Sequence, residues 1–341
     1  MGFGNEFLER ASKEYRIRSV ESDYELVGRL ISEAVDMVCA MNGNVKAEDV
    51  KVYMHGSYPN KTNTFFPSRL EVAVELGRTS DFDPSDEACV GYKVHNNYFV
   101  ETTFEFNPSD FSGLLYMALQ ELTGGACVQS DKFIEIPKGE IEGFGVCKHI
   151  VEIMPCFTFK YREKVDVNEA VVFEEGLQIQ SKGGEKVSTG VLLYCRHVNS
   201  HIVTFPRLHE SNGKGKDLAT GGNFLHMVRL FKTLNTIGYR ESDFLRTRGY
   251  FVQCLLFNVP NELFILPNMG DEPDGDDLRV VFYKILNWLT NCEIGQFVCQ
   301  NLVWGLFGKA EEFWSEEEAR VFIRDVKKLH DSFPGGRTEL V

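Results

Sequence analysis

The chain has 341 residues, 43% of them hydrophobic, and a formal net charge of −14 at pH 7. This length and apolar content predict a large buried core, in two lobes or in one large domain, and exclude a disordered chain. Because an acidic surface repels phosphate groups, we expect no binding to long nucleic acid and none to an anionic membrane.

The first two predicted helices cover residues 5–17 and 22–42, where apolar residues recur at helical spacing. Alternating apolar residues then predict strands at 50–55 and 70–76. A Gly-Ser turn and a polar loop at 58–68 connect these two strands. The order is therefore strand, turn, loop, strand.

The middle of the chain mixes both kinds of periodicity. Residues 78–94 are acidic and are interpreted as irregular, 112–123 predict a helix, and 149–159 predict a third strand. A β-rich segment follows at 171–205, and its last part, 191–205, has the alternation of a β-hairpin.

Helical periodicity dominates from residue 221 onward. The predicted helices are 221–234, 243–257, 277–291 and 315–332. The acidic, Gly- and Pro-containing stretch 268–277 predicts a surface loop between helices. These patterns predict an α+β fold, with a mixed β-sheet lobe over residues 1–210 and a helical lobe over residues 211–341.

Nine cysteines are scattered along the chain without a Cys-x-x-Cys pair, which indicates reduced core thiols. The first twenty residues carry charge throughout, and no apolar stretch is long enough to span a bilayer. We therefore expect a cytoplasmic protein that does not enter the membrane.

The Gly-Ser turn at Gly56 and Ser57 precedes a set of residues typical of nucleotidyl transfer. That chemistry uses two divalent cations held by acidic side chains, and a neighbouring Gly-Ser turn offers N–H groups and a hydroxyl to phosphates. Glu71 and Glu152 stand at the second and third acid positions, whereas Arg69 stands at the first. Arg69 and Glu71 share a strand face, because residues two apart in a strand point the same way.

A guanidinium at position 69 changes what the two glutamates are expected to hold. Replacing an anion by a cation changes the local charge by two units. Each unit acts on a divalent ion with about 8 kcal/mol at ~4 Å and an effective dielectric of about 20, before relaxation. We therefore expect Arg69 to pair with Glu71 and Glu152 and to weaken metal binding. Glu75, two pleats beyond Glu71 on the same face, is not expected to replace the lost acid.

Four segments of the chain, in order, resemble motifs of the CD-NTases. These are bacterial relatives of cGAS and oligoadenylate synthase that make cyclic oligonucleotide signals in antiphage (CBASS) systems. The segments are HGSYPNKTNTFFPSRLEVAVEL (55–76), HIVEIMPCFTFKYR (149–162), FPRLHESNGKGKDLATGGNFLHMVRLFKTLN (205–235) and GYFVQCLLFNVPNELF (249–264). The resemblance runs from about residue 20 to 330, and it implies a nucleotidyltransferase (polymerase-beta-like) fold.

The resemblance also implies which residues contact the nucleotide. The expected nucleotide-binding residues are Gly56, Ser57, Lys216, Arg229 and Lys232. For Arg229 and Lys232, a solvated helix face is an equally open interpretation. Leu225 stands where the family usually has a phosphate-binding lysine. Glu71 and Glu152 are the expected metal ligands, for Mg²⁺ or Mn²⁺, only if the chain is active.

Some members of the CD-NTase family carry a zinc loop, so zinc is an alternative role for nearby Cys and His residues. Cys195, His197, His201 and His209 lie within a short span, but the hairpin alternation explains Cys195 as a core residue, and no zinc is expected. His55, beside the Gly-Ser turn, is too isolated to be assigned as a base.

Three functional hypotheses follow. The first is a catalytically impaired homologue that binds an NTP, a cyclic oligonucleotide or a protein partner in a defence operon. The second is an active synthase of cyclic or linear oligonucleotides that uses Glu71 and Glu152 with Mg²⁺ while Arg69 turns away to grip a phosphate. The third is a protein-interaction module without a ligand.

Overall fold

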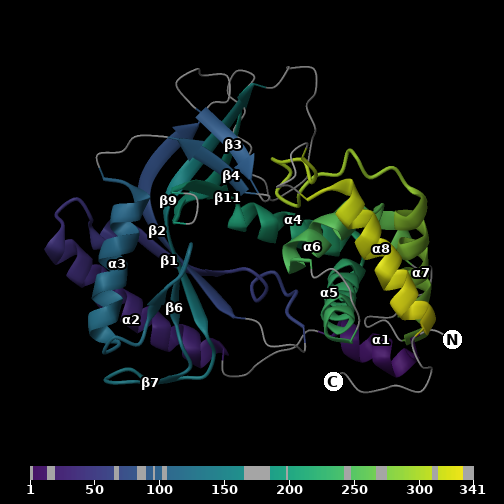
Figure 1. Cartoon of the computed structure of the whole chain (residues 1–341), viewed down its shortest axis with the longest axis horizontal. Coiled ribbons are helices and arrows are strands. Elements are labelled where there is room, and N and C mark those ends of the chain that lie inside the picture. The colour runs from purple at the N-terminus through teal and green to yellow at the C-terminus, as the bar shows by residue number, and fades with distance from the viewer. Residues whose placement is uncertain are drawn as a thin grey trace. The chain divides into compact units, whose positions relative to one another are not determined.

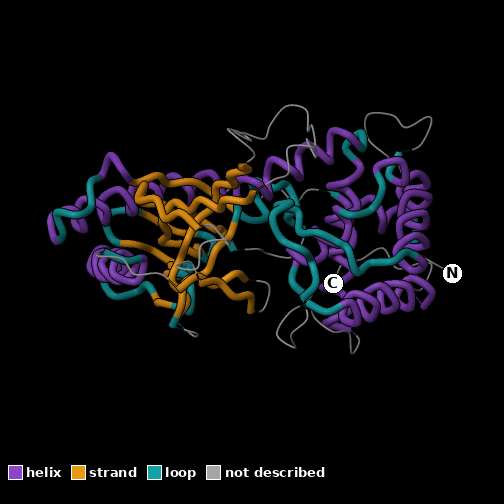
Figure 2. Tube along the Cα trace, turned by 90° about the horizontal axis from the view of Figure 1, so that it is seen from above, coloured by secondary structure: helices purple, strands orange, loops and turns teal. Residues whose placement is uncertain are grey.

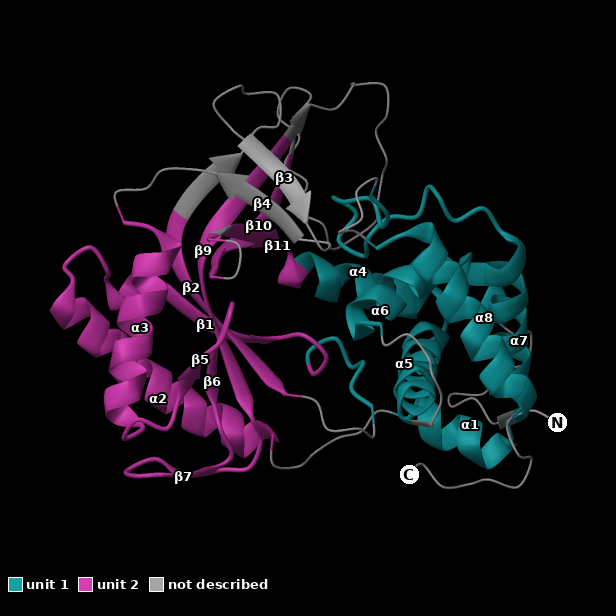
Figure 3. Cartoon of the chain, in the orientation of Figure 1, with its two compact units in different colours: residues 1–16, 59–68, 208–341 teal, residues 17–58, 69–207 magenta. Residues whose placement is uncertain are grey.

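A computed structural model of the chain describes residues 3–13, 20–64, 69–82, 90–94, 97–101, 106–164, 185–196, 199–241, 247–265, 275–308 and 314–332 (Figure 1). The chain divides into two compact units (Figure 3). The sheet unit comprises residues 17–58 and 69–207, and the helical unit comprises residues 1–16, 59–68 and 208–341.

The sheet unit is built on a mixed nine-stranded sheet with the order β1-β2-β9-β10-β11-β4-β3, in which β6 also pairs with β9 and β5 pairs with β6. Strands β2 and β9 are parallel, whereas the other described pairs are antiparallel. The strands are β1 (Val50–His55), β2 (Leu70–Phe82), β3 (Val90–Val94), β4 (Asn97–Glu101), β5 (Val128–Gln129), β6 (Ile134–Ile136), β9 (Val151–Lys164), β10 (Glu185–Cys195) and β11 (Ser200–Thr204). Strands β7 (Gly139–Ile141) and β8 (Gly145–Cys147) form a separate hairpin.

Two helices, α2 (Val20–Met41) and α3 (Pro108–Leu122), pack together beside this sheet (Figure 1). The apolar face predicted for the first of them is buried, with Leu30 and Ala34 fully inaccessible. Helix α3 begins at a capping box on Asn107, which explains its start at a proline. The short 3₁₀ helix η1 (Ala47–Asp49) leads into β1.

Where the structure describes it, the helical unit consists of helices and loops, and the named strands belong to the sheet unit (Figure 2). Its elements are α1 (Asn5–Ser12), α4 (Pro206–Ala219), α5 (Asn223–Glu241), α6 (Gly249–Phe257), η2 (Asn261–Leu263), α7 (Gly275–Asn291) and α8 (Glu316–Ser332). Helix α4 begins two residues before the division. Buried aromatic residues of α1, α5 and α7 contribute to the core of this unit. The rings of Phe231 in α5 and Phe282 in α7 have their centres 5.3 Å apart.

Most predicted elements are confirmed, one interpretation was wrong, and one helix was missed. Residues 78–94 are not irregular throughout, because β2 continues to Phe82 and β3 begins at Val90. Helix α4 was not predicted, since Gly213 and Gly215 lower its intrinsic helix propensity. Most of the predicted loop at 268–277 lies outside the described residues. None of the described helices combines the length and apolar character needed to cross a membrane.

The structure groups the first sixteen residues and residues 59–68 with the helices, whereas the sequence pattern had put them in the sheet lobe. Arg229 of α5 explains this grouping. Its Nε donates to the carbonyl of Ser12 at 2.5 Å, and its Nη1 donates to the carbonyl of Lys61 at 2.7 Å. One buried guanidinium thus ties both segments to the same helix.

Candidate functional site

Four polar residues form a row across neighbouring strands of the sheet unit. His55 of β1 pairs with Glu71 of β2, Glu71 pairs with Glu152 of β9, and Glu152 pairs with Glu135 of β6. Side chains of directly paired residues lie on the same face, with Cβ atoms ~5 Å apart. This acid row, Glu71–Glu152–Glu135, therefore brings together the two predicted glutamates and a third one.

Arg69 is bound to this row. Its Nη1 donates to Oε2 of Glu135 at 2.6 Å and to Oε1 of Glu152. The Arg69 side chain is 50% exposed, whereas that of Glu152 is 13% exposed, so the cation lies over the more buried acid. The hydrogen bond to Glu152 is the main cause that raises the pKa of Arg69 above its ordinary value, so its charge is permanent.

The predicted pairing of Arg69 with Glu152 is confirmed, and its pairing with Glu135 was missed. The pairing predicted between Arg69 and Glu71 stays a prediction. Strand β6 has only three residues, with the sequence Ile-Glu-Ile. Its alternation is a signal for an outward-facing acid. Such a short run does not reveal that Glu135 pairs with Glu152, because that register depends on a contact between distant parts of the chain.

Gly56 lies directly beneath the carboxylate of Glu71. Its φ of +78° is in the left-handed region, which favours glycine. A Cβ at this position would overlap the Glu71 carboxylate. The predicted Gly-Ser turn thus leaves space for Glu71, and Ser57 follows within the same turn.

His55 ends the row on the side of β1. Its Nε2 is buried and has no hydrogen-bond partner among the described residues. Burial lowers the pKa of His55 to about 4, so the ring is neutral at pH 7. It therefore adds no positive charge beside Glu71.

Glu75 does not extend the acid row. Its side chain is buried, accepts from the hydroxyl of Thr158 at 2.7 Å, and forms an ion pair with Arg207 at 2.9 Å. The Arg207 guanidinium also stacks over the ring of Tyr53, 4.6 Å from its centre. Glu75 is thus neutralised locally by a second arginine.

The resemblance to nucleotidyltransferases implies a site for two divalent cations at the acid row. Carboxylates are suitable ligands for Mg²⁺. Here, however, the charge of Glu152 is already compensated by Arg69 at hydrogen-bond distance. A guanidinium in that place repels any cation, and the side chains as arranged do not fit a two-metal site.

In the helical unit, Lys216 is enclosed rather than solvated. Its Nζ donates to the carbonyl of Val259 at 2.7 Å and to Oδ1 of Asn261 at 2.8 Å. The ammonium also lies 5.3–5.8 Å from the ring centres of three phenylalanines: Phe224, Phe257 and Phe264. These contacts hold α4 to the segment after α6, and the assignment of Lys216 to phosphate stays a prediction.

Burial lowers the pKa of Lys216 to about 8, so the contribution of this lysine to the stability of the fold should depend on pH. Because the unfolded lysine binds its proton more tightly, this group adds stability as pH rises from about 8 to 10.5. We expect the free energy of unfolding of the wild type, relative to Lys216→Met, to increase by about 2 kcal/mol over this range. Urea unfolding followed by circular dichroism measures it.

Lys214→Met is the matched control, because Lys214 is exposed on the same helix and pairs only with Glu210 in the contacts that the structure describes. Its stability curve should run parallel to that of the wild type over the same pH range. Parallel curves for Lys216→Met as well would contradict the prediction.

Arg229 and Lys232 bind the chain segment that follows the Gly-Ser turn. The solvated-face interpretation is wrong for Arg229, which is 5% exposed and holds the backbone as described above. Lys232 Nζ donates to the carbonyl of Thr62 at 2.6 Å, and Gln253 donates to the Thr62 hydroxyl at 2.8 Å. The polar loop predicted at 58–68 is therefore anchored on α5 and α6 where the structure describes it.

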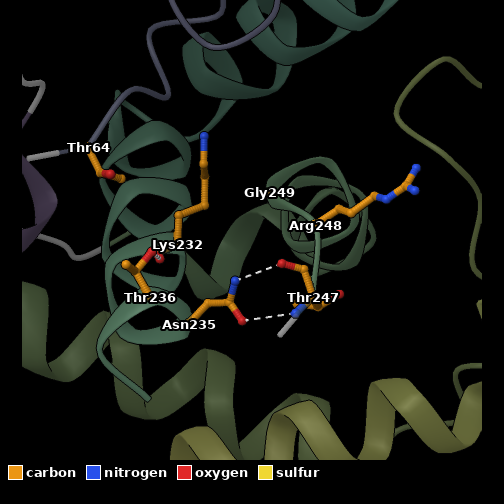
Figure 4. Close-up of a pocket in the computed structure, with 7 residues that line it drawn as sticks. All are labelled: Thr64, Lys232, Asn235, Thr236, Thr247, Arg248 and Gly249. Carbon is orange, nitrogen blue, oxygen red and sulfur yellow. Dashed lines mark hydrogen bonds between the residues drawn. The ribbon is translucent and has the colours of Figure 1, made fainter. Parts of the chain in front are cut away.

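A basic hollow of about 550 Å³ opens beside Lys232, at the N-terminus of α6. Figure 4 shows Lys232 and Arg248 on its wall, with Asn235 hydrogen-bonded to the backbone of Thr247. The other lining residues are Thr64, Thr236 and Gly249. Two cations, hydroxyl groups and a helix N-terminus together suit an anion such as phosphate.

Two further expectations concern residues outside these groups. Leu225 is 7% exposed and belongs to the core, so it offers no charge to a ligand.

Cys195 is buried, as its alternation predicted, and its Sγ contacts Asp131. His209 contacts Tyr250, and His197 lies outside the described residues. Within the described residues, no group of three His, Cys, Asp or Glu side chains has the arrangement of a metal site.

Comparison with known proteins gives a consistent result. Residues 211–331 match the family model for the cGAS/DncV-like nucleotidyltransferase C-terminal helical domain. The chain is 25% identical over 306 residues to the cyclic nucleotide synthase CdnE01 of Staphylococcus haemolyticus, covering 88% of this chain and 91% of that one. It is 26% identical over 283 residues to the cyclic UMP-AMP synthase of Rhodothermus marinus, covering 82% and 84%.

The fold is also similar to that of a solved structure, the Rhodothermus marinus CdnE c-UMP-AMP synthase with Apcpp and Upnpp. The TM-score is 0.69 at 22% identity, with 98% of each chain covered. Together with the mixed sheet, its parallel β2–β9 pair and the C-terminal helices, these matches lead to one conclusion. Residues 211–331 carry the C-terminal helical domain of the cGAS/DncV-like nucleotidyltransferases, and the chain has an α+β nucleotidyltransferase fold like that of the CD-NTases.

Proposed function

We propose that this chain is a CD-NTase homologue that binds a nucleotide or a nucleotide signal and has impaired nucleotidyl transfer. The observation that carries the proposal is the position of Arg69, whose Nη1 is bonded to both Glu152 and Glu135. In this chemistry the acids hold cations that activate the attacking hydroxyl and neutralise the leaving pyrophosphate. An arginine bound to them supplies positive charge but no exchangeable coordination site.

The basic hollow of the helical unit supports nucleotide binding. Lys232 and Arg248 provide two positive charges, and α6 presents its N-terminus to the same space. The related Rhodothermus marinus synthase has been solved with the nucleotide analogues Apcpp and Upnpp. We infer that the phosphates of an NTP or of a cyclic oligonucleotide occupy this hollow.

The direct test of impaired catalysis is incubation of the purified chain with all four NTPs and Mg²⁺ or Mn²⁺, followed by chromatography of the products. No oligonucleotide product is expected. A product that disappears in the Glu71→Ala variant would refute the proposal, because it would show that the acid row still supports transfer.

Arg248 provides a test of nucleotide binding. It is exposed, and we expect Arg248→Gln to weaken ATP binding by about tenfold, the loss expected for one charge-assisted contact. Isothermal titration at low salt measures the affinity. Lys327→Gln, an exposed lysine on α8, is the matched control and should bind ATP like the wild type. An unchanged affinity in Arg248→Gln would exclude the hollow as the phosphate site.

A second candidate function is an active synthase of cyclic or linear oligonucleotides that uses Glu71 and Glu152 with Mg²⁺. The relatives favour it, because the two described above are named as synthases and align over most of the chain. The register pairing of Glu71 with Glu152 also keeps the two acids on one face. The product assay separates the two candidates.

We further propose a cytoplasmic role in antiphage (CBASS) signalling, with a protein partner from the same operon. The family assignment supports this context, and the net charge of −14 argues against long nucleic acid or an anionic membrane as the ligand. Calorimetry with ATP, GTP and cyclic dinucleotides distinguishes a nucleotide-binding protein from a module that binds protein alone.

A further inference from the structure

Glu135 is the one carboxylate of the acid row that lies outside the motif segments of the sequence. It pairs directly with Glu152 across the antiparallel β6–β9 ladder. Like charges that face each other directly across a strand pair destabilise it. A compensating cation is therefore needed between these two side chains.

Arg69 supplies that cation with a single nitrogen. Nη1 bonds Oε2 of Glu135 and Oε1 of Glu152 at the same time, so both carboxylates fix one atom of the guanidinium. The Arg69 side chain is half-exposed, and a long arginine at such a position loses conformational entropy when it is held in one place. Hydrogen bonds from two carboxylates offset this entropy loss better than a hydrogen bond from one carboxylate.

We propose that Glu135 is a positioning residue that holds the Arg69 guanidinium on Glu152, so that the three side chains form a charge clamp that competes with divalent cations for Glu152. This inference rests on the proposed function, because it explains how Arg69 remains at the acid position. The clamp comprises Arg69, Glu135 and Glu152 only.

The clamp differs in its consequences from a simple addition of negative charge. If Glu135 only added charge, its removal would weaken cation binding by the same factor whether or not Arg69 is present. If Glu135 holds Arg69, its removal also loosens the competing guanidinium, and the two effects oppose each other. The effect of Glu135 on cation binding must then depend on Arg69.

Mn²⁺ binding, measured by electron paramagnetic resonance on the full chain, tests this dependence in four proteins. These are the wild type, Glu135→Gln, Arg69→Gln and the double variant. In the Arg69→Gln background, we expect Glu135→Gln to lower Mn²⁺ affinity by about fivefold. With Arg69 present, the same change should lower it by less than about twofold or raise it. Equal losses in both backgrounds would overturn the clamp.

A second measurement decides the question if Mn²⁺ binding is too weak to detect. Arg69→Gln leaves Glu135 and Glu152 facing each other, so its urea midpoint at pH 8 should fall, and adding Glu135→Gln should restore it. In 1 M NaCl the restoration should shrink, because salt screens the repulsion between the two partly exposed carboxylates. A restoration of equal size at low and high salt would indicate packing alone and would overturn the clamp, as would its absence at low salt.

Glu135→Asp in the Arg69→Gln background serves as the conservative variant, because it keeps the negative charge opposite Glu152 and so should not restore the urea midpoint as Glu135→Gln does. The outcome is separable from that of the proposed function. Oligonucleotide synthesis by the wild type would refute impaired catalysis and leave the measured coupling intact. An absence of coupling would refute the clamp and leave the product assay unchanged.

Discussion

Arg69→Asp should bind Mn²⁺ about a hundredfold more tightly than the wild type. The substitution changes the charge beside Glu71 and Glu152 by two units, each of which acts on a divalent ion with about 8 kcal/mol before screening. The two units together give about 16 kcal/mol. If solvent screening leaves about a sixth of that sum, about 2.7 kcal/mol remains, which corresponds to about a hundredfold in affinity. Titration of Mn²⁺ followed by electron paramagnetic resonance measures the change.

Arg69→Lys is the matched control for this substitution, because it keeps the positive charge and shortens the hydrogen-bonding group. It should remain as weak as the wild type. The product assay on Arg69→Asp then has a clear meaning. New metal-dependent synthesis would indicate that the site lost its chemistry through position 69, whereas loss of an activity present in the wild type would indicate that Arg69 serves that activity. Equal Mn²⁺ affinity in Arg69→Asp and the wild type would contradict the electrostatic argument.

The local part of the candidate site could be predicted from the sequence. Arg69 and Glu71 follow from strand alternation, and Glu152 follows from the next apolar strand with an acid inside it. The parallel register that pairs Glu71 with Glu152 agrees with that prediction. Arg69 and Glu71 are only two residues apart, so their shared face follows from local strand alternation alone.

The parts that the sequence did not predict depend on contacts between distant segments. Glu135 acquires its role only because β6 pairs with β9, and Arg229 becomes a buried anchor only because the chain around Lys61 packs on α5. A helical pattern places Arg229 on a face but does not say what that face contacts. Lys216 likewise acquires its aromatic enclosure from residues that follow it by 8, 41 and 48 positions.

Gly56→Ala is expected to destabilise the chain by about 1–3 kcal/mol and to displace Glu71. The φ of Gly56 is +78°, and a non-glycine residue held in that region costs about this much. The added Cβ also overlaps the Glu71 carboxylate, so this side chain has to leave its place above the turn. Urea unfolding measures the first effect, and Mn²⁺ binding in the Arg69→Asp background measures the second, as a loss of affinity.

Gly28→Ala is the matched control for this glycine, since Gly28 lies inside α2 and a Cβ there meets nothing within 4 Å. Alanine is the better helix former, so this variant should gain up to about 1 kcal/mol. In a Glu71→Ala background, Gly56→Ala retains only the backbone strain. A cost that stays the same there would show that the Glu71 side chain moves freely, and that Gly56 is needed for the turn rather than for the position of the carboxylate.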